Sequence, residues 1–137
     1  EQLEWNRDVD NFEVLRRSDV LISDFSGVVF DFALVYDKPV IYTDTEFDTA
    51  PYDAWWLDGE LWTIGALRRI GMELTVDKMD SLKDMIDACM DDPRFAAGCQ
   101  EVRDETWQCY GEGAERTVDY LVAKHAELMG HEKDSAR

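Results

Sequence analysis

The fold is decided by the stretch Asp19-Val20-Leu21-Ile22-Ser23-Asp24-Phe25-Ser26-Gly27-Val28-Val29-Phe30-Asp31-Phe32-Ala33-Leu34-Val35-Tyr36. Its first part, residues 19–23, is a short apolar run that is typical of a strand buried on both faces of a parallel sheet. Residues 24–27 predict a tight turn. Residues 28–36 are apolar on nearly every side, which predicts a buried helix whose start Asp24 or Ser26 can cap.

A second strand follows at once. Asp37-Lys38-Pro39 ends the helix, because proline disfavours helical backbone in the residue before it. Residues 40–42, Val-Ile-Tyr, then have the composition of a strand. The separation of the two runs allows a strand, a helix and a parallel strand, so we expect a βαβ unit with a right-handed crossover.

The rest of the chain extends this α/β pattern. We expect short helices near residues 10–17 and 64–69, a third strand over 72–76 and three later helices. The first of these is capped by Asp80, the second begins at Asp92-Pro93 and the third follows Gly113. The expected fold is a three-layer, Rossmann-like parallel sheet with flanking helices over residues 10–129, between a flexible segment (1–9) and a flexible tail (130–137).

The net charge and the cysteine spacing limit the kinds of binding partner that we expect. The formal net charge is -17, and a surface of that sign repels nucleic-acid phosphates, so we expect no nucleic-acid partner. Cys89, Cys99 and Cys109 follow no zinc pattern, and we interpret them as free thiols in a reducing cytoplasm. We expect no metal and no cofactor. No apolar run reaches the ~18 residues of a membrane span.

The predicted turn has the chemistry of a phosphate site. A helix start presents unpaired N–H groups and a partial positive charge. Ser26 adds a hydroxyl donor, and Gly27 allows a phosphate to approach the backbone. The turn also follows the carboxyl end of a strand, where ligands of open α/β sheets bind. The alternative is a capped helix with no ligand.

The stretch from Ser18 to Ala33, followed by Lys38-Pro39-Val40-Ile41, resembles the signature of the CDP-glycerol glycerophosphotransferase family of the teichoic-acid type. The segment Gly111-Glu112-Gly113-Ala114-Glu115-Arg116 resembles the part that precedes the family's last helix. The resemblance implies the C-terminal portion of a GT-B fold. It also implies that CDP-glycerol phosphates are bound by Asp24, Ser26, Gly27, Asp31 and Arg116.

Two positions depart from the family pattern. Gly27 stands where many members have a second serine, so one hydroxyl donor is lost. The family's tyrosine-aspartate pair after the second strand has no clean equivalent, although Asp44 or Glu46 could be offered.

The implied function is transfer of glycerol phosphate from CDP-glycerol to a hydroxyl acceptor in cell-wall polymer synthesis. The setting is the cytoplasm or the cytoplasmic face of a bacterial membrane. We expect the chain alone to be inactive, with the general base in a missing N-terminal domain, and to self-associate through the open edge of the strand at 19–23. The alternatives are a non-catalytic α/β interaction module and part of another GT-B enzyme that uses a nucleotide sugar.

Overall fold

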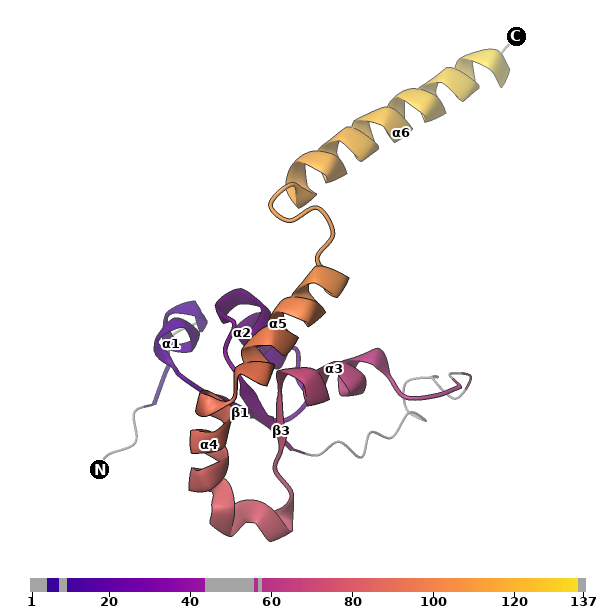
Figure 1. The fold of residues 1–137 in the computed structure, drawn as a ribbon. Helices are drawn as coiled ribbons and strands as arrows, with labels where there is room; N and C mark the ends of the chain where they lie inside the picture. Colours follow the sequence, from indigo (N-terminus) through magenta and orange to yellow (C-terminus); the bar gives the residue numbers. More distant parts are fainter. Residues whose placement is uncertain (1–4, 8–9, 44–55, 57, 136–137) are drawn as a thin grey trace. The chain divides into compact units, whose positions relative to one another are not determined.

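The computed structural model describes residues 5–7, 10–43, 56 and 58–135, with side chains up to residue 130 (Figure 1). The chain divides into two compact units, Glu1–Glu105 and Thr106–Arg137. The first unit holds the sheet and is described first. Asp44 and Glu46, offered above as equivalents of the family's acidic residue, lie outside the described residues.

The first unit contains a three-stranded parallel sheet in the order β1-β2-β3, formed by β1 (Leu21–Ser23), β2 (Val40–Tyr42) and β3 (Gly71–Glu73). The predicted βαβ unit and third strand are therefore confirmed, although β3 begins and ends earlier than the predicted 72–76. Its start follows from packing, because a Cβ on Gly71 would collide with the carbonyl oxygen of Val40. Only glycine lets the two backbones approach this closely.

Two helices connect these strands. α2 (Val28–Tyr36) buries Val29, Phe32, Ala33 and Leu34. It ends at its C-cap residue Asp37, which has left-handed backbone (φ 54°). α3 (Trp62–Ile70) precedes β3, and the Trp62 ring stacks on Phe30 of α2 with centroids 5.7 Å apart. A short helix, α1 (Phe12–Arg17), contacts α2 beside it (Figure 1). The predicted helices at 10–17, 28–36 and 64–69 are confirmed.

A fourth helix covers the sheet through a separate apolar cluster. The 3₁₀ helix η2 (Val76–Ser81) leads into α4 (Leu82–Asp91), which packs on β2 and β3. The cluster joins Ile41 of the sheet to buried residues from α4 and its neighbours: Leu74, Met85, Cys89 and Phe95. Ile41 and its register partner Met72 both face this cluster, so the mixed α/β architecture with helices flanking a parallel sheet is confirmed.

α5 (Pro93–Thr106) contacts the C-terminal ends of α2 and α3. A Cβ on Gly98 would collide with the carbonyl oxygen of Arg69, so α5 lies directly against the last turn of α3. Arg103 donates hydrogen bonds to the Leu34 carbonyl (3.1 Å) and to the Asp37 carboxylate (2.7 Å) at the end of α2. These contacts lie at the amino end of the sheet and leave its carboxyl end for other contacts.

Some predictions are wrong in instructive ways. The strand at 19–23 was expected to be buried on both faces, but Ile22 is 45% exposed. Among the described strands β1 pairs only with β2, and α4 packs on the other two, so β1 lies at an edge. The predicted caps are also wrong, since neither α2 nor α4 has a side-chain hydrogen bond at its N-cap.

The second unit consists of a turn and a long helix, α6 (Gly113–Ser135). The turn contains two left-handed residues, Cys109 (φ 56°) and Gly111 (φ 80°), and a stacked pair of rings, Trp107 and Tyr110. The backbone of α6 is helical as far as Ser135, so the helix extends into the segment that the sequence analysis assigns to a tail. Within the described part of the chain, no helix is both long and apolar enough to cross a membrane.

Candidate functional site

The predicted turn at 24–27 links the carboxyl end of β1 to the start of α2, and its polar side chains, Asp24 and Ser26, are exposed while Phe25 is half-buried. The Asp24 carboxylate organises it. One carboxylate oxygen accepts a hydrogen bond of 2.8 Å from the Ser26 amide and another of 3.3 Å from the Ser23 hydroxyl. Hydrogen bonds from the Ser26 side chain and then its amide lower the pKa of Asp24, so this residue stays charged at neutral pH.

The start of α2 is open in the way that an anion requires. Gly27 is the N-cap, and no described side chain caps the helix there. The first N–H groups of a helix have no acceptor four residues earlier in the helix, and since the Val29 amide donates to the Ser26 carbonyl (3.1 Å), the amides of Gly27 and Val28 are the ones that could donate to a ligand. A Cβ built on Gly27 would meet nothing within 4 Å, which shows that the space above the turn is free of the described protein atoms. The Ser23 and Ser26 hydroxyls lie 3.4 Å apart beside it.

The other two predicted residues occupy different positions. Asp31 is exposed in the first turn of α2, where a negative charge favours the helix dipole. A carboxylate at this position repels a phosphate. Asp31 is therefore better placed to stabilise the helix than to bind the ligand. Arg116 belongs to the second unit, where its Nε donates to the Glu112 carboxylate at 2.8 Å.

A row of polar residues was missed by the sequence analysis. Ser23, Tyr42 and Glu73 are register partners at the ends of the three strands, so they lie side by side across the carboxyl edge of the sheet. Tyr42 is only 3% exposed. Burial raises the pKa of its hydroxyl, and the charge of Glu73 raises it further. The row extends the candidate site from the turn towards α3.

An ion pair joins α3 to the segment before it. Arg68 of α3 contacts the Glu60 carboxylate at 2.6 Å, and both side chains remain substantially exposed. Glu60 raises the pKa of Arg68, with smaller contributions from Tyr42 and Glu73. The ion pair with Glu60 therefore fixes the guanidinium of Arg68. No motif marks this pair in the sequence, because the two residues are eight positions apart and meet only once α3 has formed.

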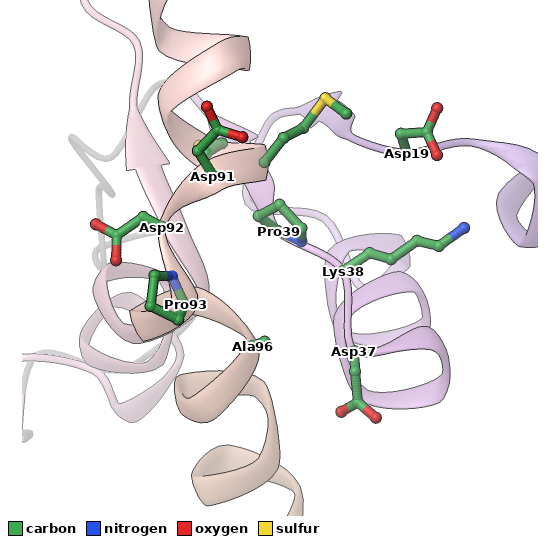
Figure 2. A pocket seen from close by; sticks show the side chains of 10 residues that line it. Asp19, Asp37, Lys38, Pro39, Asp91, Asp92, Pro93 and Ala96 are labelled. Carbon is green, nitrogen blue, oxygen red and sulfur yellow. The ribbon is translucent and has the colours of Figure 1, made fainter.

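A cavity of about 380 Å³ lies at the opposite end of the sheet (Figure 2). Its walls come from the segments before β1 and β2 and from the junction of α4 and α5, and they carry Asp19, Asp37, Asp91 and Asp92. Lys38 also lines it, but its ammonium donates to the carbonyls of Arg16 (2.8 Å) and Ser18 (2.6 Å). An acidic cavity at the amino ends of the strands is poorly suited to a phosphate ligand.

The remaining candidate reactive groups are the cysteines and the possible metal ligands. All three cysteines are free, as predicted, but Cys89 and Cys99 are buried. Burial raises the pKa of Cys99 to about 12, which makes it a poor nucleophile. Among the described residues, no group of three or more His, Cys, Asp or Glu side chains is arranged to hold a metal ion.

Comparison with known proteins identifies a family that matches most of the chain. Residues 4–119 match the family described as CDP-Glycerol:Poly(glycerophosphate) glycerophosphotransferase. The matched region contains the turn at 24–27, the whole sheet and Arg116. No curated protein and no solved structure matches the chain.

Proposed function

Because the chain belongs to the CDP-glycerol:poly(glycerophosphate) glycerophosphotransferase family, we propose that its turn at 24–27 binds the donor phosphates of CDP-glycerol. The observation that carries this proposal is the exposed, uncapped start of α2 directly after the carboxyl end of β1. An open helix start of this kind supplies N–H donors and a favourable field for an anion. Ser26 adds a hydroxyl at the same point.

The proposed reaction is transfer of glycerol phosphate to a hydroxyl acceptor. The acceptor oxygen attacks the β-phosphorus, the bond from that phosphorus to the bridging oxygen breaks, and CMP leaves. The hydroxyl proton passes to a general base. Such transfers depend on positioning and on stabilising the charge of the phosphate oxygens. In this scheme the turn holds the diphosphate while the acceptor approaches.

Asp24 is a poor candidate for the general base. Its carboxylate already accepts hydrogen bonds from the turn, and these lower its pKa. A weakly basic group accepts a proton inefficiently at neutral pH. We therefore assign the base to another part of the enzyme and this chain to the donor-binding part of a GT-B fold. On this assignment the 137-residue chain alone releases no CMP from CDP-glycerol above the buffer rate.

We assign the reaction to cell-wall polymer synthesis of the teichoic-acid type, at the cytoplasmic face of a bacterial membrane. This assignment is supported by the family's poly(glycerophosphate) acceptor. A second proposal concerns assembly. β1 lies at the edge of the described sheet and exposes Ile22, so it can pair with the same strand of a second copy.

Calorimetric titration tests the donor proposal and its alternatives together. We expect CDP-glycerol to bind the chain saturably and a UDP-sugar to bind much more weakly. Ser26→Ala should weaken CDP-glycerol binding, whereas Ser81→Ala is a matched control because Ser81 makes no cap hydrogen bond at the start of α4. Tighter binding of the UDP-sugar would favour another GT-B transferase. Binding of neither donor would favour an interaction module.

A further inference from the structure

The Lys38-Pro39 pair belongs to the stretch that resembles the family signature, but the proposed donor site uses neither residue. Both residues lie between α2 and β2, at the amino end of the sheet. The Lys38 side chain extends from there towards the chain segment that carries Asp19 (Figure 2). The contacts of this pair therefore concern the start of β1 and not the turn at 24–27.

The strand β1 has few contacts that hold it in the sheet. It consists of three residues and, among the described strands, pairs only with β2. The side chain of Ile22 at its centre is exposed, so burial of this residue contributes little. An edge strand has a hydrogen-bonded neighbour on one side only. Each contact between the chains of β1 and β2 therefore matters for keeping β1 in place.

Pro39 interrupts the hydrogen-bond ladder between these two chains. The Thr43 amide donates to the Ser23 carbonyl at 3.0 Å, so every second amide before Thr43 is directed towards the chain of β1. The second amide in this series belongs to residue 39, and proline has no N–H to donate. By the register of the two strands, the carbonyl that would accept this hydrogen bond is that of Asp19.

The Lys38 ammonium supplies donors to the same segment. It donates to the carbonyl of Ser18 at 2.6 Å, directly before Asp19, and to the carbonyl of Arg16 at 2.8 Å. The Tyr36 ring lies beside the ammonium, whose nitrogen is 5.9 Å from the ring centroid, and such a cation is attracted to an aromatic face. Hydrogen bonds from a charged donor are stronger than those from a neutral amide. The Lys38 side chain therefore ties the segment before β1 to the segment before β2.

We propose that Lys38 is a latch for the edge strand: its ammonium replaces the hydrogen-bond donor that Pro39 lacks and keeps β1 attached to β2. Without the ammonium, β1 opens while β2 and β3 stay paired. This inference goes beyond the proposed function and does not rest on it, because it requires no ligand. It assigns a role to a pair of residues that sequence patterns place in the family signature.

The test is amide hydrogen exchange, followed by NMR in the full 137-residue chain. The Thr43 amide reports on the pairing of β1 with β2 through its hydrogen bond to the Ser23 carbonyl. The Leu74 amide donates to the Tyr42 carbonyl at 2.8 Å and reports on the strands β2 and β3. Lys38→Met should speed exchange at Thr43 by about tenfold or more, as expected for local opening after loss of a charged donor, and should leave Leu74 unchanged.

Pro39→Ala tests the link between the two residues, because alanine restores an amide donor at this position. In the Pro39→Ala background, Lys38→Met should speed exchange at Thr43 by only about threefold or less. Comparing the single and double variants removes the independent effects of losing the proline. Lys83→Met is the matched control for loss of an ammonium, since Lys83 pairs with Asp87 on the exposed surface of α4.

Circular dichroism establishes that each variant is folded. Unchanged exchange at Thr43 in folded Lys38→Met, or equal acceleration at Thr43 and Leu74, would overturn the inference. An equal effect of Lys38→Met with and without Pro39→Ala would also overturn it, because the ammonium would then not replace the missing donor. Lys38→Gln keeps a neutral donor and should give a smaller acceleration at Thr43 than at least tenfold, again without a change at Leu74. If Lys38→Met does not fold, the same comparison of Thr43 with Leu74 in Lys38→Gln decides the question.

Discussion

The Ser26 amide donates a 2.8 Å hydrogen bond to the carboxylate of Asp24, two residues earlier in the chain. This contact closes the turn between β1 and α2 and orients the Ser26 hydroxyl towards Ser23. The carboxylate of Asp24 therefore stabilises the backbone of the turn. The Ser26 hydroxyl and the start of α2 remain available to contact a ligand.

The charge state of Asp24 reports on this turn. We expect its carboxyl to titrate below its ordinary pKa of 3.8. Because the folded-state pKa is depressed, its contribution to stability is present above pH 3.8 and is lost as the pH falls through the lower, folded value. Ser26→Ala should move the titration midpoint back towards 3.8, and Ser81→Ala should not. Carbon-detected NMR of the carboxyl group measures it, and a midpoint at or above 3.8 in the unmodified chain would refute this account of the turn.

Gly27 can accept a side chain without strain. It has helical backbone (φ -55°), and a Cβ there meets nothing within 4 Å. Gly27→Ser would restore the second hydroxyl of the family's pattern, and we expect CDP-glycerol to bind about two- to tenfold more tightly. Gly27→Ala is the matched control, because it adds the Cβ without the hydroxyl. Equal affinity of the serine and alanine variants would show that this position does not face the donor.

Gly98 is expected to behave in the opposite way. A Cβ there collides with the Arg69 carbonyl oxygen, so Gly98→Ala must push α5 away from α3. We expect a loss of about 1–3 kcal/mol in the free energy of unfolding, measured by urea denaturation. Gly65→Ala is the control, because its Cβ makes only an ordinary contact and helix propensity favours alanine. Equal stability of both variants would contradict the close packing of α5 on α3.

The edge of the sheet gives a prediction about assembly. We expect the molar mass from size-exclusion chromatography with light scattering to rise with protein concentration, and Ile22→Lys to prevent the rise, since a charge on an edge strand opposes pairing. Val76→Lys is the control, because Val76 is 92% exposed on η2, away from β1. A constant monomer mass for the unmodified chain would rule out association through this edge.

The sequence predicts the βαβ unit well because its signals are local. The apolar runs at 19–23, 28–36 and 40–42 and the stop at Pro39 each act within a few residues. The start of β3 and the position of α5 depend instead on Gly71 and Gly98, where distant backbones come into contact. Single-sequence patterns contain no information about such contacts.

The candidate site divides in the same way. Asp24, Ser26 and Gly27 are adjacent in the chain, so a strand-turn-helix pattern is enough to find them. Tyr42 and Glu73 come beside Ser23 only through the register and order of the strands. The predicted cap of α2 is wrong because Asp24 accepts its hydrogen bond from the Ser26 amide, one residue before the N-cap, and not from an amide of the helix.

The most direct test of the donor site is an amide NMR titration of the isotope-labelled chain with CDP-glycerol. The account predicts saturable shifts that are largest at the amides of Gly27 and Val28, where the uncapped helix start meets the diphosphate. Binding with those amides unmoved, and with the largest shifts around Lys38 and Asp91 in the cavity at the other end of the sheet, would contradict it.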